Sequence, residues 1–132
     1  MLVADTSALV SLATAEVLDL LLATYDVHTT ETVVEELRDT AEYDDRRAVA
    51  AEAVLDRRDE LTVCSVDDPF TSSRIDEGAG SCAVVARHDD ADFLLTDDLR
   101  ALPELQRAVG AQVAISPLVL RGLVIRGLLD ED

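Results

Sequence analysis

The sequence contains no lysine, asparagine or tryptophan, so all 11 basic residues are arginines. Asp and Glu outnumber them at 28, which gives a formal net charge of −17. In dilute buffer such a charge repels itself and destabilises the compact chain, whereas about 1 M salt shortens the Debye length to about 3 Å. The composition therefore predicts adaptation to the salty cytoplasm of an extreme halophile. It also makes a single surface carboxylate weak evidence of function.

Cysteine, glycine and proline are scarce as well, with 2, 5 and 3 residues respectively. Cys64 and Cys82 lie in apolar stretches, and no CxxC or Cys/His spacing surrounds them. A zinc site is therefore not expected, and both thiols are predicted to be free, reduced and buried. The two histidines, His28 and His88, are interpreted as structural.

Long apolar runs are missing too. The longest is far short of the roughly 20 residues that a membrane span needs. The first residues carry no basic segment, and Asp5 breaks their apolar stretch, so no signal peptide is expected. A length of 132 residues, 48% of them hydrophobic, suits a single domain over residues 1–132. We expect a cytoplasmic protein with no membrane association.

Short apolar runs alternate with stretches of helical periodicity. Strands are expected at 1–7, 26–29, 61–66, 91–96 and 111–116, and helices at 8–24, 31–39, 45–60, 75–89, 97–110 and 117–129. Thr30 is expected to cap the second helix, and Pro103 is a possible break in the fifth. Strands that are apolar on both faces favour a parallel sheet covered by helices. The prediction is a three-layer α/β/α domain with a mainly parallel central sheet.

Polar residues end two of the expected strands. The first strand runs into Asp5, Thr6 and Ser7, and the fourth into Thr96, Asp97 and Asp98. Ligands of open α/β sheets bind at the carboxyl ends of the strands, so these edges are candidate sites. Asp or Ser at such a place can also simply cap the following helix. Two such edges in one small domain favour a functional site.

A third candidate lies on the helix at 31–39. Glu36 is three residues from the apolar Val33 and so near the inner face of the helix, whereas Glu35 lies further round. Glu36 can therefore point toward the edge of the sheet. The alternative, a surface acid in an acidic protein, stays open at this point.

The stretches VADTSALVSL, VVEEL, DEGAGSCAVVA and LLTDD occur in this order along nearly the whole chain. This ordered set resembles the PIN-domain family, most closely its stand-alone and VapC-toxin-like branch. The resemblance implies a metal-dependent ribonuclease with a carboxylate cluster on a parallel sheet. Carried over by position, it makes Asp5, Glu36 and Asp98 catalytic residues and metal ligands. It adds Asp97 as a further possible ligand and Thr6, Ser7 and Thr96 as supporting residues.

The third of these stretches departs from the family pattern. The family's acid falls on Ala79, and the nearest acids are Asp76 and Glu77. One interpretation makes Glu77 a replacement ligand, although an acid in the first turn of a helix is also favoured by the helix dipole. The other interpretation is that the site has lost a ligand.

Converging carboxylates repel one another without a cation, and Mg²⁺ or Mn²⁺ prefers carboxylate and water oxygens. Such an ion can activate a water for attack on a phosphodiester. The resemblance further implies single-stranded RNA as substrate, a toxin role with an antitoxin protein as partner, and a homodimer formed in part by the helix at 117–129. The possible phosphate contacts are Arg46, Arg47, Arg100, Arg121 and Arg126.

Two other functions compete with a ribonuclease. A PIN fold without catalysis would serve as a nucleic-acid- or protein-binding module, and Glu77 is the residue that discriminates it from an enzyme. An aspartyl phosphatase or receiver domain needs a second Asp two residues after the first, where Ser7 stands, and usually a lysine. The sequence disfavours that class.

Overall fold

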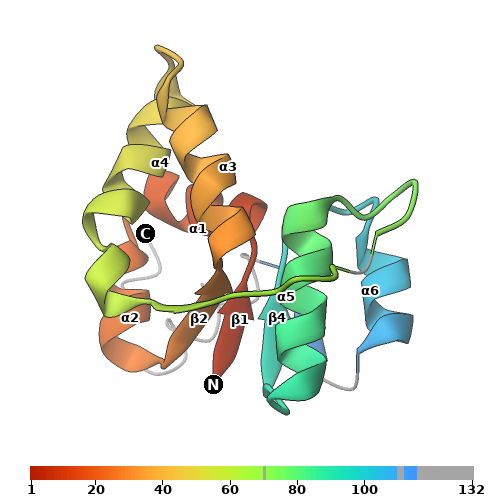
Figure 1. Ribbon diagram of the computed structural model, residues 1–132. Coiled ribbons are helices and arrows are strands. Elements are labelled where there is room, and N and C mark those ends of the chain that lie inside the picture. Colours follow the sequence, from red (N-terminus) through yellow and green to blue (C-terminus); the bar gives the residue numbers. More distant parts are fainter. Residues whose placement is uncertain (70, 110–111, 116–132) are drawn as a thin grey trace.

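A computed structural model describes residues 1–69, 71–109 and 112–115 of the chain (Figure 1). The helix expected at 117–129, together with Arg121 and Arg126, lies outside the described residues.

Five parallel strands form one sheet in the order β3-β2-β1-β4-β5. The strands are β1 (Leu2–Ala4), β2 (Val27–Thr30), β3 (Thr62–Cys64), β4 (Phe93–Leu95) and β5 (Gln112–Ala114). Every residue of the central strand β1 is buried, as expected for a strand with helices over both faces. The predicted parallel sheet is confirmed.

Helices flank this sheet. They are α1 (Thr6–Thr14), α2 (Leu18–Thr24), α3 (Glu31–Ala41), α4 (Arg46–Asp56), α5 (Glu77–His88) and α6 (Leu102–Ala108), with a 3₁₀ turn at Arg58–Glu60. Helices α3 and α4 stand side by side and project beyond the end of the sheet, while α5 packs against β2, β1 and β4 (Figure 1). The α/β class is as predicted, and Thr30 caps α3 by accepting a hydrogen bond from the Val33 amide.

The expected helix at 8–24 is wrong in one respect, because two helices bent by 117° replace it. Helix α1 ends in a Schellman motif: the Glu16 amide donates to the Ala13 carbonyl and the Val17 amide to the Leu12 carbonyl. Glu16 has a φ of 61°, a conformation that usually calls for glycine. No glycine marks this break in the sequence, and the apolar periodicity continues across it. The sequence pattern therefore predicted a single helix.

The helix expected at 97–110 is also shorter than predicted, because α6 begins only at Leu102. Before it, the amides of Ala101 and Leu102 donate to the Asp98 carbonyl in a tight turn. Pro103 lies in the first turn of α6, where a missing N–H costs nothing. The proline therefore helps to begin the helix rather than to interrupt it.

No single helix among the described residues is long and apolar enough to cross a membrane, and only the bent pair α1 and α2 together reach that length and hydropathy. Three of their leucines, Leu9, Leu12 and Leu21, are completely buried in the core, whereas Leu20 and Leu22 are half-buried. The core therefore accounts for the apolar character of this pair.

The chain order creates a switch point in the sheet. From β1 the chain adds β2 and then β3 toward one edge, and afterwards it returns to place β4 on the other side of β1. Ligand sites of open α/β sheets lie at the carboxyl ends of the strands where the order reverses. Here that place is between the ends of β1 and β4.

Candidate functional site

Asp5 follows β1 directly and lies at this switch point. Its carboxylate accepts hydrogen bonds from the Ala8 amide at 3.0 Å and the Ser7 hydroxyl at 2.7 Å, and it interacts with the side chain of Thr96. Only 4% of Asp5 is exposed. Burial raises its pKa to about 6 despite these hydrogen bonds, and the charge of Asp76 raises it further. Asp5 thus caps α1, which was the alternative to a functional role, but it is also a buried acid at the edge of the sheet.

Hydroxyl groups join the ends of β1 and β4. The Ser7 hydroxyl accepts a hydrogen bond from the Asp97 amide at 2.9 Å and lies 3.4 Å from the Thr96 hydroxyl oxygen. The Thr96 hydroxyl in turn accepts one from the Asp98 amide at 3.1 Å. These contacts fix the two loops of the switch point relative to each other.

Glu36 reaches the same place from α3. Its carboxylate accepts a short hydrogen bond from the Thr6 hydroxyl and another from the backbone of Gly78. Burial raises the pKa of Glu36, and the charges of Asp76 and Asp5 raise it further. Glu35, its neighbour on the helix, is exposed to solvent. The two acids of this pair therefore have the different environments that the sequence predicted.

Gly78, in the first turn of α5, makes this approach possible. A Cβ atom at this position would overlap the carboxylate of Glu36. Only glycine can occupy the position while Glu36 stays where it is. Sequence reasoning did not assign Gly78 a role, and the only signal was a glycine in a helix where glycine is otherwise unfavourable.

Asp76 is the acid of the third stretch that acts on the site. It caps α5 by accepting a hydrogen bond from the Ala79 amide at 2.8 Å, and its charge raises the pKa of both Asp5 and Glu36. Glu77 is exposed at the start of the helix, and its role as a ligand stays a prediction. Ala79, where the family pattern has an acid, belongs to the hydrophobic core and is 4% exposed.

Asp98 lies at the same edge of the sheet, but its carboxylate makes hydrogen bonds within its own loop. Its Oδ1 accepts hydrogen bonds from the amides of Arg100 at 3.0 Å and Ala101 at 3.4 Å, so it stabilises the turn before α6. Asp98 and Asp97 are both half-buried. Their assignment as metal ligands stays a prediction.

The donor set fits a hard metal ion. Within residues 1–69, 71–109 and 112–115, no ion pair involves Asp5, Glu36 or Asp76. Asp5 and Glu36 also lie close enough for the charge of Asp5 to raise the pKa of Glu36. Oxygen donors of this kind suit Mg²⁺ or Mn²⁺ rather than a thiophilic ion.

A family model described as PIN domain (DUF3368) matches residues 1–126. The chain belongs to the PIN-domain family. The resemblance drawn from the four sequence stretches is thereby confirmed, and PIN domains are typically nucleases that commonly bind divalent metals. A sequence search of curated proteins finds no match to the chain.

The two thiols of this PIN domain differ from each other. Both are free, and Cys82 is fully buried, as predicted. Cys64 is only half-buried, contrary to the prediction, because its strand β3 lies at the edge of the sheet. Its sulfur also lies near His28, which sequence spacing had not connected with it.

Proposed function

We propose that this PIN domain is a divalent-metal-dependent endoribonuclease, which cleaves single-stranded RNA by water attack on the phosphodiester. The observation that carries the proposal is the convergence of Asp5 and Glu36, with which no arginine of the described residues forms an ion pair. Burial and neighbouring acids raise the pKa of both carboxyls, so their charged forms are unfavourable in this site unless a cation is bound. A site of this kind is common where function, rather than stability, determines the arrangement.

In this proposal Asp5 and Glu36 hold Mg²⁺ or Mn²⁺, and the candidates for the remaining ligands are Asp98, Asp97 and Asp76, with Glu77 as the alternative to Asp76. When bound, the ion lowers the pKa of a water and stabilises negative charge on the phosphodiester. The hydroxyls of Thr6 and Ser7 donate to the two carboxylates and orient them. The Gly78 backbone gives Glu36 a second donor, so both acids are positioned before any ligand arrives.

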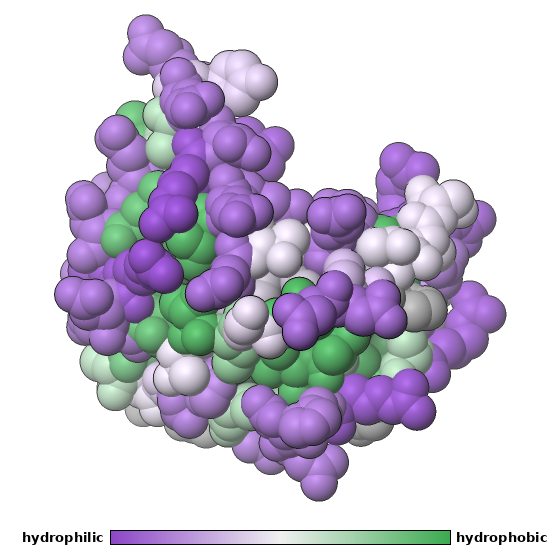
Figure 2. All heavy atoms as spheres, in the orientation of Figure 1, coloured by the Kyte–Doolittle hydropathy of each residue, from purple (hydrophilic) through white to green (hydrophobic). Residues whose placement is uncertain are grey.

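The shape of the surface supports a strand of nucleic acid as substrate. Figure 2 shows a hollow between the projecting α3–α4 pair and the upper part of the neighbouring lobe, with a largely hydrophilic surface around it. Arg100 is exposed two residues after Asp98, and Arg46 and Arg47 are exposed at the start of α4. Arginine can bind phosphate through two parallel hydrogen bonds. The net charge of −17 disfavours non-specific binding of RNA, so we assign selectivity to these few contacts.

The same proposal includes a toxin role, with an antitoxin protein that neutralises the enzyme in the cytoplasm, and a homodimer. Light scattering of the full chain in molar KCl tests the dimer, and a monomer would count against it. A small neighbouring gene for a DNA-binding protein that abolishes the cleavage would support the antitoxin.

The decisive test is cleavage of a single-stranded RNA by the full chain with Mn²⁺ in molar KCl. We expect Asp5→Asn to reduce the rate by roughly 100-fold or more, since even the partners of metal ligands are worth about 10- to 100-fold. Glu35→Gln is the matched control, because it removes an equal charge from the exposed face of α3 and should leave the rate unchanged. Equal cleavage by wild type and Asp5→Asn would refute the proposal.

A second candidate function is a PIN-fold module that binds RNA or protein without cleaving it. The core alanine at position 79 favours it, because the family pattern has an acid there. Saturable binding of Mn²⁺ and RNA by the wild type, with no cleavage above that of Asp5→Asn, would establish the module instead of the enzyme.

A further inference from the structure

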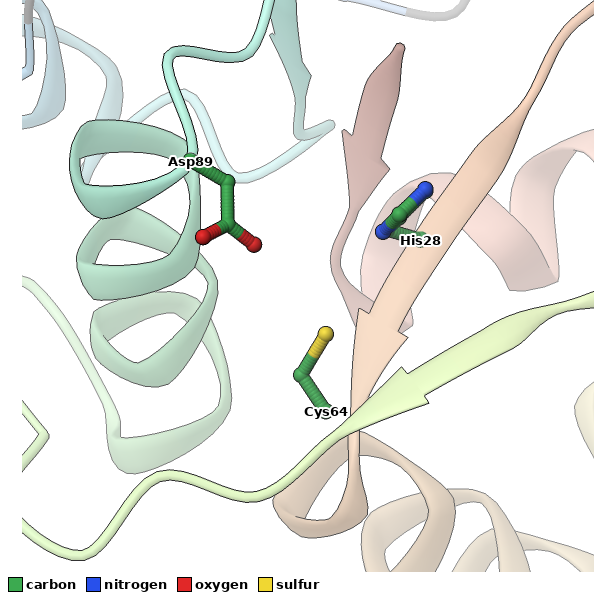
Figure 3. A group of neighbouring side chains, drawn as sticks. All are labelled: His28, Cys64 and Asp89. Carbon is green, nitrogen blue, oxygen red and sulfur yellow. The ribbon is translucent and has the colours of Figure 1, made fainter.

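A second group of potential ligands lies away from the carboxylate cluster. His28 of β2, Cys64 of β3 and Asp89, which directly follows α5, each offer one ligand atom, and these atoms lie within 4.8 Å of one another (Figure 3). Asp89 caps the carboxyl-terminal end of α5, whereas Asp76 caps its other end. The 12 residues of α5 span roughly 18 Å, so the two groups are separate sites.

The imidazole of His28 has one nitrogen engaged and one without a partner among the residues that the structure describes. Nε2 lies 3.0 Å from the Asp26 carboxylate, while Nδ1 is buried and makes no hydrogen bond within the described part of the chain. Figure 3 shows one ring nitrogen turned toward the gap between Cys64 and Asp89. A buried nitrogen without a partner is costly, and metal-bound histidines typically donate their other N–H to a carboxylate. The Asp26 contact leaves the Nδ1 lone pair available to an ion.

The Cys64 sulfur and the Asp89 carboxylate lie on the other side of the gap. Burial raises the pKa of the Cys64 thiol, and the charge of Asp89 raises it further. A divalent cation reverses this effect, because a coordinating thiol loses its proton. Asp89 also lies at the carboxyl-terminal end of a helix, where the helix dipole disfavours an acid and favours a cation. The one printed side-chain partner of Asp89 is the exposed His88, whose Nδ1 lies 2.9 Å from Asp89 Oδ1, so the other carboxylate oxygen stays available to an ion.

We propose that His28, Cys64 and Asp89 bind a Zn²⁺ ion, with a water as the fourth ligand. One nitrogen, one sulfur and one oxygen suit this ion better than Mg²⁺ or Mn²⁺. Ligand atoms around tetrahedral zinc are about 3.5 Å apart, so small side-chain movements, above all of the exposed Asp89, must close the present spacing by about 1 Å. The Asp89 side chain is 39% exposed, which leaves room for that movement and for the water.

The site would connect two strands and a helix that are far apart in the sequence. No motif spacing marks it, which is why the sequence had disfavoured zinc. By holding β3, β2 and the end of α5 together it would act as a structural clip, and such a clip stabilises most when it closes long loops. Zinc binding at this site does not depend on whether the carboxylate cluster cleaves RNA.

Titration of the reduced full chain with Co²⁺, followed by absorption spectroscopy, tests the site. We expect a thiolate-to-cobalt charge-transfer band together with the visible bands of tetrahedral cobalt, and displacement of both by Zn²⁺. Cys64→Ser should abolish the charge-transfer band, whereas Cys82→Ala and Asp5→Asn should retain it. Absence of the band in wild type, or its persistence in Cys64→Ser, would overturn the proposal.

A second measurement does not depend on a ligand variant. Asp26→Asn removes only the carboxylate partner of His28 Nε2, and we expect it to weaken zinc binding by about 10- to 100-fold while the cobalt spectrum keeps its shape. An unchanged zinc affinity would show that His28 does not bind the ion through Nδ1. Far-UV circular dichroism on each variant confirms that the fold is retained.

Discussion

Helix α5 carries an acid at each end, and the two acids lie in opposite environments. At its start, Asp76 satisfies the helix amides and faces Asp5 and Glu36, which a network of hydroxyl and amide donors holds in place. At its end, Asp89 opposes the helix dipole, contacts the exposed His88, and lies beside a thiol and the His28 imidazole, of which one nitrogen has no partner within the described residues. The carboxylates at the start of the helix are held by hydrogen bonds. The nitrogen, sulfur and oxygen atoms at its end must still move closer together to bind an ion. One helix can thus organise a preformed site for a hard ion and a looser site for zinc.

Among changes in helix α5, the largest effect should come from Gly78→Ala, which tests how rigid the first site is. The added methyl would overlap the Glu36 carboxylate and displace it. A misplacement of about 1 Å can cost roughly 100-fold in rate, and we expect that loss in Mn²⁺-dependent cleavage of RNA.

The double variant Gly78→Ala/Glu36→Asp tests the cause of this loss. The shorter acid leaves room for the methyl, so part of the activity should return. If Gly78→Ala cleaves as fast as wild type, the contact between α5 and Glu36 has no role in positioning the acid.

The next effect concerns the stability of the metal-free protein. Folding raises the pKa of Asp5 from 3.8 to about 6, so the folded chain binds this proton more tightly than the unfolded chain. The resulting stabilisation is complete below about pH 4 and is lost as the pH rises through about 6. At neutral pH, Asp5→Asn should therefore be more stable than wild type by roughly 2–3 kcal/mol.

Chemical denaturation in chelator measures this difference, which should shrink toward zero near pH 4. Mn²⁺ should stabilise wild type and leave Asp5→Asn unchanged. A variant less stable than wild type at neutral pH would mean that Asp5 serves the helix cap more than the site.

A smaller effect, on the affinity for Mn²⁺, should distinguish the two acids at the start of α5, Asp76 and Glu77. Asp76→Asn should weaken Mn²⁺ binding by roughly tenfold, because its charge acts on both Asp5 and Glu36. Glu77→Gln removes an equal charge from the neighbouring exposed position and should change the affinity less than about twofold. Isothermal titration calorimetry measures both, and the reverse order would make Glu77 the replacement ligand.

The smallest effect is at the other end of the helix. Asp89→Asn removes an acid from the unfavourable end of the dipole and should stabilise the zinc-free protein by about 0.5 kcal/mol. The same variant should lose the rise in melting temperature that Zn²⁺ gives wild type. A full zinc-induced rise in Asp89→Asn would exclude this carboxylate from the site.

Features that depend on neighbouring residues could be predicted from the sequence. The carboxylate after β1 and the Thr30 cap follow from local patterns, and the inward position of Glu36 follows from helical spacing. The break at Glu16 could not be predicted, since a non-glycine residue adopts a positive φ there because the surrounding chain requires it. That the charge of Asp76 acts on Asp5 and Glu36 depends on which way the start of α5 faces, and this is set by packing against the sheet.

Contacts between elements that lie far apart in the chain could not be predicted from the sequence. The approach of Gly78 to Glu36 joins two helices, and the group of His28, Cys64 and Asp89 joins two strands and a helix end. In both cases the residues lie tens of positions apart, so no spacing rule connects them.

The short outer strands β3 and β5, each of three residues, bear on how the protein behaves at high concentration. An open strand edge lets another copy extend the sheet through backbone hydrogen bonds, which is a common beginning of aggregation. Like charges normally keep such edges apart, but salt screens the repulsion between chains of net charge −17. Edges that offer only a few backbone donors and acceptors give protection that salt does not remove. In a concentrated brine, it is this shortness more than the acidic surface that would keep the molecules dispersed.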